Sequence, residues 1–318
     1  MRNRQNLPER QTILELLKRA SSHFKSQHIE NPRASAEILL SHLLNMERID
    51  LYLRYDQPLS ADEARRFDAL VQRRLRREPV AYIIGEKNFW SLNLRVTGDV
   101  LIPRPETECL VERALEIMSA RKSAGPCCVL DLGAGSGAII LALASERPME
   151  RFFASDASMA ALSVAEDNAR RHNLDALVTF LCGRWFEPFR PLEQFDMIVS
   201  NPPYIPTRII QTLAPEIFQY EPAGALDGGP DGLDAVSIII SQAHRYMAPG
   251  GVLLMEIGWD QRKAVEDLAL RSGQYEGIRF IKDYSGHDRI LEMVKTASAG
   301  DFEKILADRK SICYKKQI

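Results

Sequence analysis

The stretch VLDLGAGSGAIILALA (129–144) decides the fold of this chain. Its first residues, VLDL, are typical of a buried strand, and the apolar run after Gly137 is typical of a helix. Gly133 and Gly135 stand between the two, where the backbone must turn sharply and can pass close to a ligand. The stretch therefore predicts a strand–turn–helix unit whose glycine turn borders a bound molecule. A glycine-rich turn without a ligand is the alternative.

Strand and helix patterns alternate after this unit, which indicates an α/β fold with a mostly parallel sheet flanked by helices. The seven predicted strands are residues 127–133, 151–156, 176–181, 196–201, 251–258, 278–283 and 289–294. Only Tyr284 to Asp288 separate the last two strands, and this is too short for a helical crossover. We therefore expect these two strands to pair antiparallel at the end of the sheet.

Residues 1–79 are predicted to form a small, all-helical domain, because apolar residues recur at helical spacing after Thr12 and again after Pro32. A third helix begins at Ser60, with Glu63 at the capping-box position. Residues 80–100 alternate apolar and polar side chains and are predicted to be a β-hairpin linker. The α/β domain then covers residues 101–295, and residues 296–318 form a polar C-terminal tail.

The composition is that of an ordinary globular chain of 318 residues, with 45% apolar and 26% charged side chains. The net charge of −2 gives the molecule no general electrostatic reason to coat nucleic acid or an anionic membrane. Residues 1–79 hold 15 of the 41 basic and 11 of the 43 acidic residues, a net charge of +4. The densest basic run in this segment is RRLRR (73–77), which is either a solvated helix face or a partner-docking surface.

The cysteines indicate neither a disulfide framework nor a zinc site. There are five of them, two are adjacent, and none has Cys-x-x-Cys spacing with nearby histidines: Cys109, Cys127, Cys128, Cys182 and Cys313. The N-terminus has no apolar core of the kind a signal peptide needs, and no apolar run is long enough to span a bilayer. We expect a cytoplasmic protein without a metal ion.

Asp156 ends the strand that follows the glycine turn, where a carboxylate can accept hydrogen bonds from a ribose diol. A dinucleotide would favour G-x-G-x-x-G, but Gly137 comes one residue early, and Asp131 precedes the turn. S-adenosylmethionine fits better, because it has no phosphate and carries an ammonium and a sulfonium that acids can neutralise. Asp156 could instead cap the next helix, a role that Ser158 could share.

The predicted strand DMIVS ends in the tetrapeptide Asn201, Pro202, Pro203 and Tyr204 at the carboxyl edge of the sheet, where α/β folds bind ligands. The prolines fix the backbone, so the Asn201 side chain and the Pro202 carbonyl can be two rigid acceptors. They suit an NH₂ group on an sp² carbon, because accepting both hydrogens restores electron density on the nitrogen for attack on a sulfonium methyl. Tyr204 can stack on the planar acceptor. The alternative is a plain proline turn.

These residues resemble the HemK/PrmC family of peptide chain release factor N5-glutamine methyltransferases. The resemblance covers roughly residues 10–295 and rests on seven stretches: EPVAYIIGEKNFW (78–90), VLIPRPETECLVERAL (100–115), VLDLGAGSGAIILALA (129–144), DASMAALSVAEDNA (156–169), IVSNPPYIP (198–206), EPAGALDGGPDGLDA (221–235) and MEIGWDQ (255–261). The tetrapeptide NPPY also occurs in adenine-N6 DNA methyltransferases, whereas the IPRPETE block and the helical domain resemble the glutamine enzymes.

The resemblance implies a Rossmann-like class I methyltransferase that transfers the methyl group of S-adenosylmethionine to the glutamine of the Gly-Gly-Gln motif in class I release factors, yielding S-adenosylhomocysteine. It implies cofactor contacts at Gly133, Ala134, Gly135, Ser136, Gly137, Asp156, Trp185 and Asn201. The substrate contacts that it implies, beside the catalytic tetrapeptide 201–204, are Arg104 and Glu106. Ala134 stands where the family usually has threonine.

Alternatives remain for several of these assignments. Trp185 could serve core packing, and Arg104 and Glu106 could form a structural ion pair. A DNA or RNA amino-methyltransferase would use the same tetrapeptide, but it would normally need a base-recognition module and a basic cleft. A non-catalytic binding protein is the third possibility. We expect a monomer whose helical domain docks the release factor, without direct nucleic-acid or membrane binding.

Overall fold

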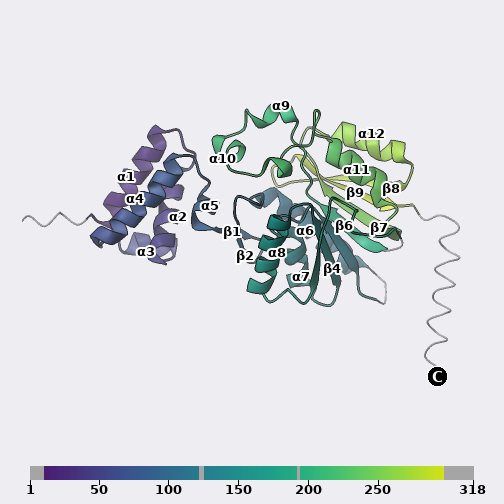
Figure 1. Ribbon diagram of the computed structural model, residues 1–318, viewed down its shortest axis with the longest axis horizontal. Coiled ribbons are helices and arrows are strands. Elements are labelled where there is room, and N and C mark those ends of the chain that lie inside the picture. The colour runs from purple at the N-terminus through teal and green to yellow at the C-terminus, as the bar shows by residue number, and fades with distance from the viewer. Residues whose placement is uncertain (1–10, 122–124, 192–193, 297–318) are drawn as a thin grey trace, which may run out of the picture. The chain divides into compact units, whose positions relative to one another are not determined.

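A seven-stranded sheet is built around β3 (Cys128–Leu132) in the computed structural model, which describes residues 11–121, 125–191 and 194–296 (Figure 1). The strand order is β5-β4-β3-β6-β7-β9-β8. Neighbours from β5 to β7 are parallel, whereas β9 is antiparallel to both β7 and β8. The other strands are β4 (Arg151–Asp156), β5 (Val178–Cys182), β6 (Phe195–Ser200), β7 (Met247–Glu256), β8 (Tyr275–Lys282) and β9 (Asp288–Lys295). The predicted α/β fold with an antiparallel end pair is confirmed.

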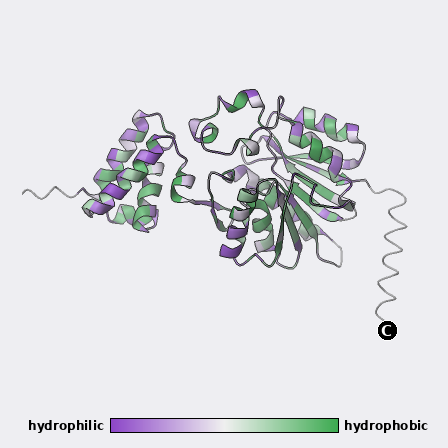
Figure 2. Ribbon diagram, in the orientation of Figure 1, coloured by the Kyte–Doolittle hydropathy of each residue, from purple (hydrophilic) through white to green (hydrophobic). Residues whose placement is uncertain are grey.

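Two hydrophobic clusters cover the two faces of this sheet. Val129 belongs to the cluster that includes α6 (Glu108–Ala120) and α7 (Ala138–Glu146). Leu130, which points to the opposite face, belongs to the cluster that includes α11 (Asp234–Ala243) and α12 (Arg262–Ser272). The strands are accordingly hydrophobic along most of their length in Figure 2. Because both faces of the central strands are buried, β3 and β6 are mostly apolar.

Contacts divide the chain into two units. One contains the chain up to Glu86 together with Ala214–Tyr220, and the other contains Lys87–Leu213 and the chain from Glu221 onward. The helices of the first unit are α1 (Ile13–Ser26), α2 (Pro32–Leu44), α3 (Arg48–Leu53), α4 (Ala61–Leu75), α5 (Val80–Ile84) and α10 (Pro215–Phe218). The second unit also contains β1 (Glu86–Phe89, of which Glu86 is assigned to the first unit), β2 (Leu92–Arg95), η1 (Pro105–Thr107), α8 (Met159–Arg171), α9 (Thr207–Ile210) and η2 (Ala223–Ala225).

The start of the predicted β-hairpin linker is wrong. Residues 80–84 form α5, in which Ile83 is buried against the other apolar residues of the helical unit, and Gly85 ends this helix with a φ of 78°. The hairpin begins only after that glycine, as the two-stranded sheet β1–β2. The apolar run VAYII is compatible with a helix or a strand, and packing against the helical core stabilises the helix.

The predicted helix starts at Thr12 and Ser60 are confirmed. These two residues cap α1 and α4, and in each case a glutamate three residues later completes the capping box.

Three of the four arginines in the basic run RRLRR form ion pairs within the helical unit. Arg74 is buried, with a residue exposure of 5%, and its guanidinium lies 2.8 Å from a carboxylate oxygen of Glu216 in α10. Arg77 binds the other oxygen of Glu216 at 2.7 Å, and Arg73 pairs with Glu78 at 2.5 Å. The run therefore holds residues 214–220 in the helical unit, an arrangement that the sequence spacing of 139 residues between Arg77 and Glu216 concealed.

Within the described residues, no helix has the length and apolar character needed to cross a membrane. The predicted polar tail lies outside the described residues from position 297 onward, and so does Cys313. The described cysteines Cys109, Cys127, Cys128 and Cys182 are all free thiols.

Candidate active site

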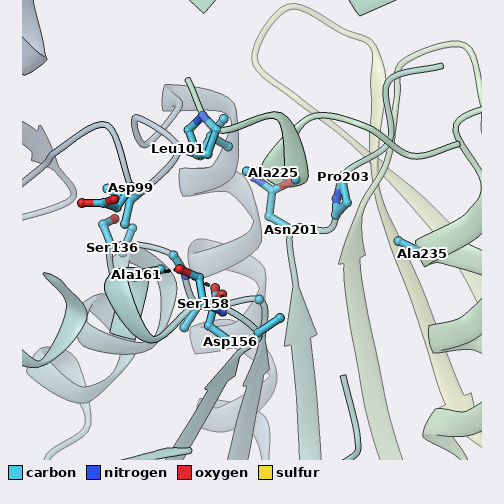
Figure 3. A pocket seen from close by; sticks show the side chains of 18 of the residues that line it. Asp99, Leu101, Ser136, Asp156, Ser158, Ala161, Asn201, Pro203, Ala225 and Ala235 are labelled. Atoms are coloured by element: carbon cyan, nitrogen blue, oxygen red, sulfur yellow. Dashed lines mark hydrogen bonds between the residues drawn. The ribbon is translucent and has the colours of Figure 1, made fainter. Parts of the chain in front are cut away.

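A cavity of about 770 Å³ opens at the carboxyl ends of β3, β4 and β6. Its lining includes Gly133–Ser136 after β3, Asp156–Ser158 after β4, and Asn201 and Pro203 after β6. Figure 3 shows Asp156 and Asn201 at the ends of two strands that border this one cavity. The three loops that the sequence singled out are therefore brought together, although they are far apart in the chain. All the lining residues belong to the unit that carries the sheet.

The glycine turn is held in place by backbone and carboxylate acceptors. Gly133 has a φ of 78°, and its N–H donates to the Ser155 carbonyl at 2.8 Å. The Gly135 N–H donates to Oδ2 of Asp156 at 2.9 Å. Because left-handed backbone carries a steric penalty for residues with a Cβ, glycine at position 133 allows the turn to run close to the cavity.

Asp156 acts on two elements at once. Its second oxygen, Oδ1, accepts from the Ser158 N–H at 2.8 Å, while Ser158 itself caps α8 by accepting from the Ala161 N–H at 3.2 Å. The helix cap is thus Ser158 and not Asp156. Each carboxylate oxygen has a second acceptor site, so Asp156 retains the capacity to accept from hydroxyl groups of a ligand in the cavity.

Asp131 adds a second acid beside the glycine turn. It is fully buried, and neither of its carboxylate oxygens has a hydrogen-bond partner among the described residues. Burial, and secondarily the Asp156 carboxylate, raise the pKa of Asp131 to about 7. Two acids at the turn fit a ligand that carries a cationic group, which would favour ionisation of Asp131. They do not suit the pyrophosphate of a dinucleotide.

Gly137 packs closely against neighbouring side chains at the start of α7. It is not among the residues that line the cavity, and it begins α7 with a φ of 81°. A Cβ at this position would lie 3.0 Å from Cδ1 of Leu141 and 3.3 Å from Cβ of Ala165. The contacts therefore explain this glycine by close packing around the start of α7, and the predicted cofactor contact at Gly137 is not supported.

Trp185 lines the cavity and also packs against the core. It lines the cavity beside Gly133, and its ring also packs against the hydrophobic cluster on one face of the sheet. Its backbone has a φ of 52°, which is unusual for a residue with a bulky side chain. The indole is therefore held in a fixed place at the cavity wall.

The tetrapeptide 201–204 follows β6 and is tied to two other elements. The Asn201 amide Nδ2 donates to Oγ1 of Thr107 at 3.2 Å, and the Tyr204 hydroxyl donates to Oε1 of Glu256 at 3.1 Å. Burial and the Glu256 carboxylate raise the pKa of Tyr204. Asn201 and Pro203 line the cavity, whereas Pro202 and Tyr204 are not among its lining residues. Direct substrate contacts of Pro202 and Tyr204 stay predictions.

The alternative in which Arg104 and Glu106 form a structural ion pair is not what the structure shows. Arg104 lines the cavity and forms an ion pair of 2.5 Å with Glu221, a buried residue in the segment after the tetrapeptide. The other oxygen of Glu221 accepts from the Ile102 N–H at 3.2 Å. Glu106 is not among the lining residues, so its proposed substrate contact stays a prediction. Glu221 therefore fixes the segment that supplies this wall of the cavity.

Comparisons with known proteins cover both the helical region and the sheet-bearing unit. Residues 15–85 match the PrmC N-terminal domain, and residues 125–299 match a methyltransferase domain. The release factor glutamine methyltransferase of Caulobacter vibrioides is 40% identical over 284 residues, which cover 89% of this chain and 96% of that protein. The enzyme of the same name from Geobacter sulfurreducens is 41% identical, covering 89% of this chain and 97% of that protein. The chain belongs to the release factor glutamine methyltransferases.

Among solved structures, the catalytic domain of hMettl16, crystallised with a MAT2A 3′UTR hairpin, has a similar fold. Its TM-score is 0.51 at 15% sequence identity, covering 75% of this chain and 83% of that chain. At this identity the likeness concerns the fold alone. The methyltransferase fold of the sheet-bearing unit is thus shared with that domain.

Four further residues of this release factor glutamine methyltransferase were not predicted from the sequence: Thr107, which lines the cavity, and Glu221, Glu256 and Gln261, which hydrogen-bond to Arg104, Thr107 and the Tyr204 carbonyl. Glu256 follows the apolar run VLLM in a buried strand, and Glu221 opens a segment that the resemblance itself contained. Burying an acid at the end of a strand costs free energy unless the acid is hydrogen-bonded. An acid directly after a buried apolar run was therefore the sequence signal that could have indicated a functional role for Glu256. Their partners could not be read from the sequence.

Replacing Asp156 with alanine is expected to weaken binding of S-adenosylmethionine to this methyltransferase about 10- to 100-fold, because the predicted acceptor for the ribose and the anchor of the Gly135 N–H are both lost. Titration calorimetry of the purified variant measures this change. Asp175→Ala removes an exposed carboxylate from the same unit and should leave the affinity unchanged. Equal affinities of Asp156→Ala and the unmodified protein would exclude this role of Asp156.

Proposed function

We propose that the protein methylates the side-chain amide nitrogen of the glutamine in the Gly-Gly-Gln motif of class I release factors, with S-adenosylmethionine as methyl donor. One observation carries the proposal: Asn201, with its Nδ2 held by Thr107, borders the same cavity as the glycine turn and Asp156. An acceptor for an amide NH₂ group thus lies beside a site suited to a ribose and a cationic group. We expect the reaction to take place in the cytoplasm.

The residues after β3 and β4 would hold the cofactor. The turn Gly133–Ser136 presents its backbone to the cavity, Asp156 would accept from the ribose hydroxyls, and Trp185 would flank the adenine. When bound, S-adenosylmethionine supplies a methyl group that its sulfonium makes electrophilic. The buried Asp131 and the half-buried Asp156 would supply the negative potential that a sulfonium and an ammonium require, and a bound cation would favour ionisation of Asp131.

The residues after β6 would activate the acceptor nitrogen. An amide nitrogen is a poor nucleophile because its lone pair is conjugated with the carbonyl. If Oδ1 of Asn201 and the Pro202 carbonyl each accept one N–H, the nitrogen moves towards sp³ geometry and its lone pair becomes available. A bond to the methyl carbon then forms as the carbon–sulfur bond breaks, and the nitrogen loses one proton, which its new positive charge has acidified. The substrate nitrogen therefore needs no strong base beside it before it attacks the methyl group.

Incubation of the full-length protein with labelled S-adenosylmethionine tests this function. The acceptors are a class I release factor, its variant with alanine in place of the Gly-Gly-Gln glutamine, and A-rich DNA. Peptide mass spectrometry then locates the label. Label on that glutamine alone is the expected result, whereas label on DNA or on the variant would contradict the assignment of the substrate.

A further inference from the structure

We infer that Glu256 determines, through the hydroxyl of Thr107, which end of the Asn201 side-chain amide faces the acceptor nitrogen of the substrate. Glu256 and Thr107 are positioning residues in this scheme, and of the three residues only Asn201 touches the substrate. The inference rests on the proposed function, since it explains how the amide acceptor of that reaction is oriented.

The contacts form a continuous chain of hydrogen bonds. Oγ1 of Thr107 donates to Oε2 of Glu256 at 2.6 Å and accepts from Nδ2 of Asn201 at 3.2 Å. The first of these bonds is fully buried. Its members come from η1, from the end of β7 and from the end of β6, so the chain spans three elements that are distant in sequence.

The direction of this chain follows from proton counting. A threonine hydroxyl has a single proton, and an ionised carboxylate can only accept. Once Thr107 gives its proton to Glu256, only its lone pairs remain for Asn201. The NH₂ end of the Asn201 amide must therefore face Thr107, and Oδ1 is left as the acceptor at the cavity. The opposite orientation would place an NH₂ group against the NH₂ group of the substrate.

Two hydroxyl donors and a guanidinium favour the charged, accepting form of Glu256 against the effect of burial. Besides Thr107, it accepts from the Tyr204 hydroxyl at 3.1 Å, and the Arg289 guanidinium favours its charged form. Burial outweighs these effects and raises the pKa of Glu256, to which the nearby Glu106 carboxyl also contributes. A buried carboxylate that accepts from two hydroxyls fixes the direction in which both hydroxyl protons point. Burying this acid costs solvation free energy, which an apolar residue at the same position would not lose.

Glu256→Gln tests the inference, because glutamine keeps the shape but adds an NH₂ group that can donate to Thr107 and free the hydroxyl proton. We expect kcat for the release factor to fall about 100-fold, as for the loss of one oriented polar group in an active site. The affinity for S-adenosylmethionine and the KM for the release factor should change less than about threefold. Glu292→Gln is the matched control, because Glu292 in β9 is also a buried acid and pairs with arginines. The Glu292→Gln variant should have the kcat of the unmodified protein.

Substitutions of Thr107 carry the test if Glu256→Gln fails to fold. Thr107→Val removes the hydroxyl at nearly constant volume and should lower kcat about as much as Glu256→Gln, whereas Thr107→Ser keeps the hydroxyl and should recover most of the rate. The double variant Glu256→Gln/Thr107→Val should fall no further than either single variant, because both break one chain. The inference would be overturned if the double variant lost the product of the two single-variant losses in kcat, or if Thr107→Ser were as slow as Thr107→Val.

A measurement without turnover separates this inference from the proposed function. In ¹⁵N-asparagine-labelled protein, the Asn201 side-chain signals are identified by their loss in Asn201→Ala. In Thr107→Val and Glu256→Gln their hydrogen exchange should accelerate by about tenfold or more. If exchange of the Asn201 amide is slow in the unmodified protein and accelerates in both variants, but the protein does not methylate glutamine, the proposed function alone is refuted. Methylation with unchanged exchange and kcat in both variants would refute the positioning role alone.

Discussion

Asn201→Ala is expected to lower the rate of release factor methylation by about 100- to 1,000-fold, while the affinity for S-adenosylmethionine changes less than about threefold. The substitution removes the side-chain acceptor at the end of β6 but leaves the glycine turn and Asp156 untouched. Substrate could still bind through its remaining surface, yet its amide nitrogen would keep a conjugated lone pair. Single-turnover methylation with labelled cofactor, together with calorimetry of cofactor binding, measures the two effects separately.

Gln274→Ala is the control for this variant, since it removes an exposed amide side chain that is not among the cavity-lining residues. Its rate should equal that of the unmodified protein. Turnover of Asn201→Ala within a factor of three of the control would contradict the role of the tetrapeptide.

Arg74→Glu is expected to destabilise the helical unit by about 3–5 kcal/mol, because it leaves two carboxylates in the place of a buried ion pair. Arg66→Glu, on the exposed part of the same helix, should cost less than about 1 kcal/mol. Urea unfolding followed by circular dichroism at the helix band measures both.

Restoring charge complementarity provides the decisive comparison for Arg74. The exchange Arg74→Glu/Glu216→Arg should recover part of the lost stability, although Arg77 would then face a like charge. A stable Arg74→Glu protein with only a raised KM for the release factor would instead show that this arginine serves docking.

Much of the fold could be predicted because the spacing of apolar residues and the positions of glycines are visible within short stretches of sequence. Strand β4 has the bounds 151–156 that the sequence predicted, and α4 begins after Ser60 as its capping box indicates. The short helix α5 was missed because five apolar residues have no distinguishing period, and only contact with the helical core decides their conformation.

The candidate site was predictable where it consists of ligand-facing loops and unpredictable where it depends on partners. Asp156 and Asn201 stand at strand ends, whose edge of the sheet follows from topology. The pair Thr107–Glu256 bridges 149 residues and the pair Arg104–Glu221 bridges 117, so no local pattern could reveal either. The close packing around Gly137 could not be read from the sequence either, because a glycine needed for packing looks the same there as one needed for binding.

The helical unit is discontinuous in sequence, and this affects how the enzyme can be divided. A protein that began at Lys87 would retain Glu216 but lose Arg74 and Arg77, its two partners. The segment 214–220 runs directly into Glu221, whose carboxylate holds the cavity wall, so such a truncation would disturb the methyltransferase unit as well. A chimaera that takes its helical unit from a relative must therefore exchange both segments together, the first 86 residues and residues 214–220.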